Sequence, residues 1–158
     1  AFLASVEALV AADVQVIWQT GKVYYSAITS SLGAICSPQI KVLEFLNRMD
    51  LAYALADVIV SRAGAIAISE LAIAKKPVLL VPFPFAAEDH QTENAKSLVM
   101  ENAAILITDN SSKDTLVSTA IKTLNDQDLL AKLAENSFSM GRPKAAQQIV
   151  ELITEQCK

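Results

Sequence analysis

The fold is decided by residues 57–81, DVIVSRAGAIAISELAIAKKPVLLV. The apolar, β-branched run at 57–61 predicts a strand, and the small and aliphatic residues from Gly64 to about residue 74 predict a helix. A second strand is expected at 77–81, where Pro82 ends it. A strand, a helix and a strand with short connections form a right-handed crossover between parallel strands. The stretch therefore predicts a parallel α/β sheet.

The same alternation continues on both sides of this stretch. Short apolar runs predict three more strands, at 14–18, 40–46 and 104–108, with helices expected at 1–11, 22–32, 49–56 and 89–100 and over the remainder of the chain. This order predicts one domain, 1–158, with a Rossmann-like doubly wound parallel sheet and helices on both faces. Such a domain normally opens with a strand and a glycine turn, so we expect the chain to be part of a longer protein.

Composition excludes several classes of function. The hydrophobic fraction is 53%, yet no apolar run approaches the ~20 residues of a membrane span. The net charge of -4 and the absence of a basic cluster argue against nucleic acid and anionic lipid as partners, which leaves a small molecule or another protein. Residues 1–10 show no signal peptide. Two unmatched thiols, Cys36 and Cys157, indicate a reducing cytoplasm.

The stretch SRAGAIAISE, residues 61–70, is the first candidate binding site. Ligands on doubly wound sheets bind beyond the carboxyl ends of the strands, and this segment follows such an end. A helix that starts at Gly64 and Ala65 would leave backbone N–H groups open to an anion such as a diphosphate. Glu70 would reach back toward the first turn, where its carboxylate could accept both hydroxyls of a ribose. The alternative is that Gly64 makes a tight turn and Glu70 faces solvent.

The stretch VPFPFAAEDHQTEN, residues 81–94, is the second candidate. Its prolines stiffen a loop beyond a strand, Asp89 is expected to cap a helix, and His90 and Gln91 would occupy the first turn. An amide both donates and accepts, which suits sugar hydroxyls. A polar first turn on a surface helix is the alternative, and the single histidine has no partner for a hydrolytic triad.

The acidic pair in Asp126-Gln127-Asp128 has the spacing of a known metal-binding motif, DxD. Because it precedes LLAKLAE, helix capping explains it better. We therefore expect no metal site there or elsewhere in the chain.

Two long stretches together resemble the C-terminal domain of the MurG family of peptidoglycan glycosyltransferases. These are FLNRMDLAYALADVIVSRAGAIAISELA and PVLLVPFPFAAEDHQTENA, and VIWQTGK resembles the family's first-strand signature. The resemblance implies the donor-binding half of an inverting GT-B enzyme that uses UDP-N-acetylglucosamine. It implies that Leu46 meets the uracil, that Ala65, Ile66, Ala67, Ile68 and Ser69 lie beside the diphosphate and sugar, that Glu70 binds the ribose and that Gln91 binds the N-acetylglucosamine. It also makes Gln19, Arg62, Gly64, His90 and Asn94 candidates for the donor cleft.

The resemblance covers only part of what the family needs for catalysis. The family has a glycine-rich turn and an N-terminal acceptor domain before the region matched here, and its catalytic base belongs to that domain. No residue of this chain is therefore expected to be catalytic, and no cofactor is expected. The resemblance implies a parent enzyme that acts on a lipid-linked muramyl-pentapeptide, converting lipid I to lipid II at the cytoplasmic face of the inner membrane. The domain alone is expected to be inactive, without inserting into the membrane.

Three other hypotheses fit parts of the sequence less well. A stand-alone transferase subunit with a membrane partner would be expected to retain its own first strand and glycine turn. The C-domain of a related lipid glycosyltransferase fits the SRAG and HQTEN stretches less closely. A receiver-type regulatory domain needs aspartates at strand ends, whereas the strands here end in Ser61 and Pro82.

Overall fold

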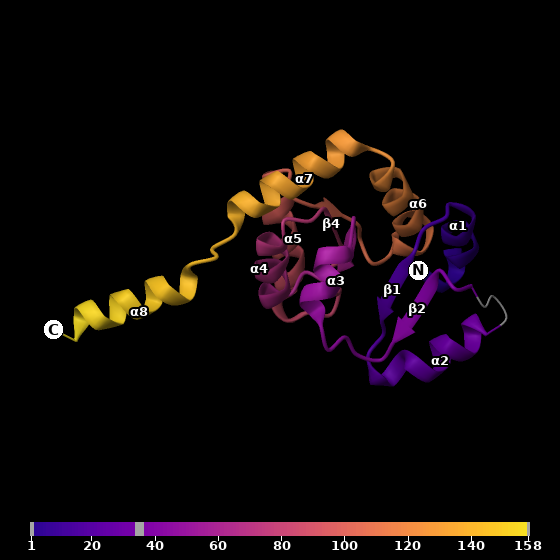
Figure 1. Ribbon diagram of the computed structural model, residues 1–158, viewed down its shortest axis with the longest axis horizontal. Helices are drawn as coiled ribbons and strands as arrows, with labels where there is room; N and C mark the ends of the chain where they lie inside the picture. The colour runs from indigo at the N-terminus through magenta and orange to yellow at the C-terminus, as the bar shows by residue number, and fades with distance from the viewer. Residues whose placement is uncertain (1, 34–36, 158) are drawn as a thin grey trace.

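The computed structural model describes residues 2–33 and 37–157. All strand pairs in it are parallel, and they form two sheets (Figure 1). The first sheet pairs β1 with β2, and the second has the order β3-β4-β5. The strands are β1 (Val16–Gln19), β2 (Ile40–Leu43), β3 (Ile59–Ser61), β4 (Val78–Leu80) and β5 (Ile105–Leu106). The α/β class with a parallel strand arrangement is confirmed.

Helices separate the strands as the sequence pattern predicts. The chain opens with a 3₁₀ turn, η1, and ends with three successive helices. The helical elements are η1 (Phe2–Ser5), α1 (Val6–Ala11), α2 (Lys22–Leu32), α3 (Met49–Leu55), α4 (Ala65–Ala74), η2 (Ala87–Asp89), α5 (His90–Met100), α6 (Ser112–Leu124), α7 (Gln127–Met140) and α8 (Ala145–Gln156). The expected strand 40–46 already ends at Leu43, so Leu46 lies in the connection to α3.

β4 is covered on both of its faces. Val78 and Leu80 join a buried cluster with residues of α4 and α5, whereas Leu79 and Val81 join a second cluster with residues of α6. Successive side chains of a strand point to opposite faces of the sheet, so helices pack against both sides of this strand. This is the doubly wound arrangement that the sequence predicts.

The sheet is interrupted between β1 and β3. In the doubly wound order 3-2-1-4-5-6, the first strand lies between the second and the fourth. With β1 to β5 in the places of the second to sixth strands, the interruption falls where that central strand would pair. Among the described residues, no strand bridges β1 and β3, so the parallel strands form two sheets.

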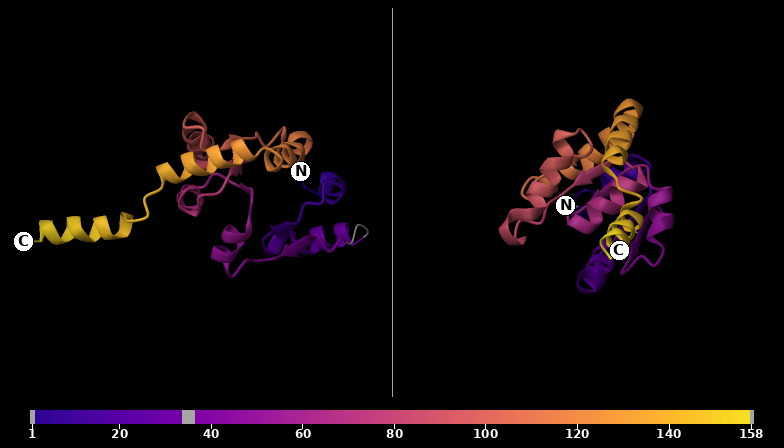
Figure 2. Two further views of the ribbon diagram at one scale, coloured as in Figure 1. Left: turned by 45° about the horizontal axis from the view of Figure 1, so that its top comes forward. Right: turned by 90° about the vertical axis from the view of Figure 1, so that its left-hand side faces the viewer.

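Two of the longer helices contribute no buried residue to the core. Neither α2 nor α8 has a buried residue, and α8 projects away from the rest of the chain (Figures 1 and 2). No helix in the described part of the chain combines the length and the apolar character that crossing a membrane requires. Of the two thiols, Cys157 is exposed, and Cys36 lies outside the described residues.

Candidate functional site

The first turn of α4 is open to a ligand. Its N-cap residue, Gly64, has no side chain to accept from the first backbone N–H groups, which lie at the positive end of the helix dipole. Gly64 has a φ of -66°, so its backbone conformation does not require glycine. A Cβ built on it meets nothing within 4 Å. The space beside the Gly64 backbone is therefore open, at the end of a helix that favours anions.

Glu70 lies on α4 and is held by a residue of α3. The Tyr53 hydroxyl donates to Glu70 Oε2 at 3.2 Å, and the hydrogen bonds of the described residues leave Oε1 without a donor. Burial of the phenol raises the pKa of Tyr53, and the charge of the nearby carboxylate and the hydrogen bond to it raise it further. Tyr53 thus stays a neutral donor that orients an exposed carboxylate, whose second oxygen can accept from a ribose hydroxyl.

Gln91 lies in the first turn of α5 with one end of its amide occupied. Its Oε1 accepts from the Phe83 N–H at 2.9 Å, which fixes the orientation of the amide. The Nε2 group is therefore the end that remains to donate to a sugar hydroxyl. Its neighbour His90 is exposed and lies 3.5 Å from a carboxylate oxygen of Glu88.

Asn94 fastens α5 to the segment before α4. Its Nδ2 donates to the Ala63 carbonyl at 3.0 Å, and Ala63 is fully buried. Asp89 precedes α5 as expected, but its side chain accepts from the Thr92 hydroxyl at 2.6 Å and makes no capping bond to a backbone N–H. Its backbone is left-handed, with a φ of 56°, which is why the expected cap geometry does not form.

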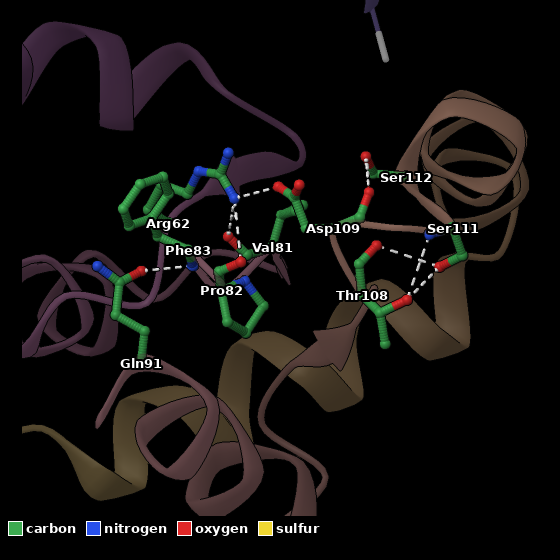
Figure 3. A network of polar contacts seen from close by, with 9 residues as sticks. All are labelled: Arg62, Val81, Pro82, Phe83, Gln91, Thr108, Asp109, Ser111 and Ser112. Atoms are coloured by element: carbon green, nitrogen blue, oxygen red, sulfur yellow. Dashed lines mark hydrogen bonds and ion pairs between the residues drawn. The ribbon is translucent and has the colours of Figure 1, made fainter. Parts of the chain in front are cut away.

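Arg62 connects the carboxyl ends of three strands (Figure 3). Its Nη1 donates to the Val81 and Pro82 carbonyls at 3.1 and 3.0 Å and to Asp109 Oδ1 at 2.6 Å. The guanidinium also lies 5.5 Å from the centre of the Phe83 ring. We call Arg62, Val81, Pro82, Phe83 and Asp109 the Arg62 cluster. A candidate for the donor cleft is thus engaged mainly with the protein itself.

Leu46 and Gln19 come together on the other sheet. Gln19, the last residue of β1, accepts from the Leu46 N–H at 2.8 Å through its Oε1. This bond fixes the loop after β2, so the backbone expected to meet the uracil is held by the candidate that lies beside it. No hydrogen bond among the described residues joins this pair to α4 or α5.

The predicted residues therefore fall into two groups. One group surrounds the first turns of α4 and α5, and the other is the pair on β1 and the loop after β2. Within the first group Ile66 is 78% exposed, Ile68 packs against the core, and the Ser69 hydroxyl donates back to the Ala65 carbonyl at 2.9 Å. Ala65 is exposed, and Ala67 is half-buried.

Sequence reasoning missed three residues that contact the predicted ones, namely Tyr53, Phe83 and Asp109. Asp109 carried a usable signal, because it follows the fifth strand and thus lies at a strand carboxyl end like the other candidates. Tyr53 and Phe83 carried none, since their contacts depend on how separate elements pack.

A metal is not suggested by the side chains present. Asp126 caps α7 by accepting from the Leu129 N–H at 2.9 Å, which confirms the capping interpretation of the acidic pair. The described residues hold no cluster of three or more His, Cys, Asp or Glu side chains arranged for a metal ion.

One known protein family matches most of the chain. The family described as the glycosyltransferase family 28 C-terminal domain matches residues 2–149. The chain belongs to this family. The MurG resemblance found in the sequence is thereby confirmed at the level of the domain.

Two relatives of this family 28 domain carry the same name. The chain is 46% identical over 145 residues to a protein of Parabacteroides distasonis and 44% identical over 151 residues to one of Cytophaga hutchinsonii. Both are named UDP-N-acetylglucosamine–N-acetylmuramyl-(pentapeptide) pyrophosphoryl-undecaprenol N-acetylglucosamine transferase. The matches cover 92% and 96% of this chain but 39% and 40% of those proteins.

A solved structure gives the same result. The crystal structure of Acinetobacter baumannii MurG matches with a TM-score of 0.76 and 33% sequence identity, covering 89% of this chain and 41% of that one. The chain thus spans about two fifths of the length of these relatives.

Proposed function

We propose that this family 28 domain binds UDP-N-acetylglucosamine, as the donor half of an inverting glycosyltransferase. The observation that carries the proposal is the open first turn of α4, with Glu70 in the second turn of the same helix and the Gln91 amide in the first turn of α5. The names of the relatives, which specify an N-acetylglucosamine transferase, support the same donor.

Each part of the donor has a chemical counterpart in this arrangement. The diphosphate would accept from the backbone N–H groups of Ala65 and Ile66 at the positive end of α4. The ribose diol would donate to Glu70 Oε1, and the sugar would accept from Gln91 Nε2. The uracil would meet the Leu46 backbone, whose N–H is already taken by Gln19, so its carbonyl is the group offered.

For the longer protein we propose the reaction of the MurG family, transfer of N-acetylglucosamine to a lipid-linked muramyl-pentapeptide to convert lipid I to lipid II. An N-terminal acceptor domain and a glycine-rich turn would supply the acceptor site and the catalytic base. Closure of the two halves would orient donor and acceptor, so this domain alone would bind the donor without transferring the sugar. We propose a cytoplasmic domain whose parent enzyme is peripheral to the inner membrane.

The proposal is tested by comparing UDP with 2′-deoxy-UDP. Titration calorimetry on the chain should show binding of UDP, and Glu70→Ala should weaken it by about tenfold, because a hydrogen bond to a charged group is lost. The same substitution should weaken 2′-deoxy-UDP less, because that ligand lacks one of the two hydroxyls that Glu70 would bind.

Glu135→Ala on α7 is the matched control, since it also removes an exposed helical glutamate and should leave both affinities unchanged. Absence of heat with both UDP and UDP-N-acetylglucosamine at millimolar concentration would refute donor binding. Equal losses for the two nucleotides in Glu70→Ala would refute the ribose role.

A further inference from the structure

We propose that Arg62 and Asp109 are positioning residues that hold Gln91 in place, and so set the preference of the domain for UDP-N-acetylglucosamine over UDP. This inference rests on the proposed function, because it assigns a task to the sugar end of the same site. It is carried by hydrogen bonds that, together with the backbone of residues 82–83, connect the start of α6 to the first turn of α5 (Figure 3).

The series begins at Asp109, which the start of α6 holds in place. The backbone carbonyl of Asp109 accepts from the Ser112 hydroxyl at 2.7 Å and from the Ser112 N–H at 3.2 Å. The hydroxyls of Thr108 and Ser111 lie 2.8 Å apart on the same turn. The carboxylate that faces Arg62 therefore projects from an ordered turn.

Arg62 links Asp109 to the segment after β4. The sheet ladder ends where the Val81 N–H donates to the Ser61 carbonyl, and Pro82 has no N–H to continue it. The carbonyls of Val81 and Pro82 find their donor in Arg62 Nη1. Asp109 binds the same nitrogen through a charge-assisted hydrogen bond, which restricts where the guanidinium can lie.

Phe83 is the member of the Arg62 cluster that contacts Gln91. Its ring lies beside the guanidinium, and its N–H donates to Gln91 Oε1. If the segment 81–83 shifts, the amide donor moves with it, and Gln91 loses the bond that directs its Nε2 outward. Arg62 would thus affect the sugar without touching it.

A direct contact between Arg62 and the diphosphate is the competing role, and the two make different predictions. A phosphate ligand contributes to UDP and to UDP-N-acetylglucosamine alike, whereas a positioning residue for Gln91 affects only the ligand that carries the sugar. Global stability should change little in either case, because the ion pair is half-exposed, with 50% and 36% of the two side chains accessible.

The experiment titrates UDP and UDP-N-acetylglucosamine into the 158-residue chain and four variants: Asp109→Ala, Asp109→Asn, Gln91→Ala and the double variant of Asp109→Ala with Gln91→Ala. Asp109→Ala should weaken the sugar nucleotide about fivefold and UDP less than about twofold, since one oriented hydrogen bond is affected. Asp109→Asn keeps an acceptor oxygen and should recover part of the loss. The double variant should bind no more weakly than Gln91→Ala alone, because both changes act on one contact. Glu135→Ala again serves as the control.

Equal weakening of UDP and UDP-N-acetylglucosamine in Asp109→Ala would overturn the positioning role, as would additive losses in the double variant. A ligand-free measurement separates this inference from the proposed function. Exchange of the Phe83 amide hydrogen with solvent, followed by NMR, should be about fivefold faster in both Asp109→Ala and Gln91→Ala than in the unmodified chain. An unchanged exchange rate in Asp109→Ala overturns the inference even if the nucleotides bind as proposed. Absence of nucleotide binding with faster exchange refutes the proposed function and, with it, the sugar preference.

Discussion

The two sheets of this domain differ in how deeply they are buried. All three residues of β4 are inaccessible to solvent, and helices cover both faces of its sheet. In β1 the exposure alternates along the strand, with Ile17 46% exposed, and the α2 helix that follows buries no residue. We call the well-buried β3-β4-β5 sheet the dense sheet and the more exposed β1-β2 sheet the sparse sheet. The parts of the candidate site that would hold the diphosphate, ribose and sugar are built on the dense sheet. The part that would meet the base is built on the sparse sheet.

This difference has a consequence for binding. Segments with few buried contacts open at a lower free energy than the core. The loop after β2 is held by bonds from Leu46 to Gln19 and from Gly21 to Glu44, on a sheet with few buried residues. The segment after β4 is fixed by bonds to Arg62 and Gln91 and follows a fully buried strand. The base end of the site should thus be the more mobile end of the free domain.

The largest expected effect is on stability. Leu79→Ala should lower the free energy of unfolding by about 2–5 kcal/mol, because it opens a cavity in a fully buried strand. Ile17→Ala removes a similar volume from a half-exposed position and should cost about 1 kcal/mol or less. Urea unfolding followed by circular dichroism measures both changes.

The single tryptophan provides an independent probe of the sparse sheet. Trp18 lies in β1, with its ring centre 5.3 Å from that of Phe2. Its fluorescence should change at a lower urea concentration than the circular dichroism if the two sheets differ in stability as their burial indicates. Coincident transitions, or equal costs for Leu79→Ala and Ile17→Ala, would show that the two sheets unfold as one unit.

The sequence predicted what depends on local pattern. Periodicity located the strands that flank α4, and Gly64 marked the start of that helix within one residue. It did not predict the contacts between distant elements, because Arg62 meets Asp109 across 47 positions and Tyr53 meets Glu70 across 17. Nor did alternation of strands and helices predict the interruption between β1 and β3, since strand order follows from packing and not from period. The candidate residues could be named from sequence, but the groups that orient them could not.

A pair of substitutions tests whether the two ends of the site act separately. Gly64→Ala should leave stability within about 1 kcal/mol, since alanine fits the backbone angles but is a poorer N-cap. It should nevertheless weaken UDP by about tenfold, because the added methyl group stands where the phosphate would approach the backbone. Uridine, which lacks phosphate, should bind Gly64→Ala as it binds the unmodified chain.

Gln19→Ala is the complementary change on the sparse sheet. It releases the Leu46 N–H and should weaken uridine and UDP by the same factor, about fivefold, because the loss lies at the base. Calorimetry with UDP and NMR titration with the weaker ligand uridine measure the two factors. If Gly64→Ala weakened uridine as much as UDP, or if Gln19→Ala affected UDP alone, the assignment of base and phosphate to the two sheets would be wrong.

The smallest expected effect concerns the link between Tyr53 and Glu70. Both burial and the neighbouring carboxylate favour the neutral phenol, so the pKa of Tyr53 is raised above its ordinary value of 10.0 in the folded chain. A raised pKa contributes stability that is fully present below the pKa of the unfolded chain and is lost as the pH rises through the pKa of the folded one. Stability should therefore decline at alkaline pH above about 10, and Tyr53→Phe should remove that part of the decline.

The chain has three tyrosines, so the tyrosinate absorbance of the unmodified chain minus that of Tyr53→Phe isolates the titration of Tyr53. The midpoint of this difference should lie above 10.0, and Glu70→Gln should move it down, because the amide removes the negative charge beside the phenol. Glu135→Gln removes a carboxylate from α7 and should leave the midpoint where it is. Burial alone would also raise the pKa, so the response to Glu70→Gln is the decisive measurement. A midpoint that does not move in that variant would mean that the phenol does not orient the carboxylate proposed to bind the ribose.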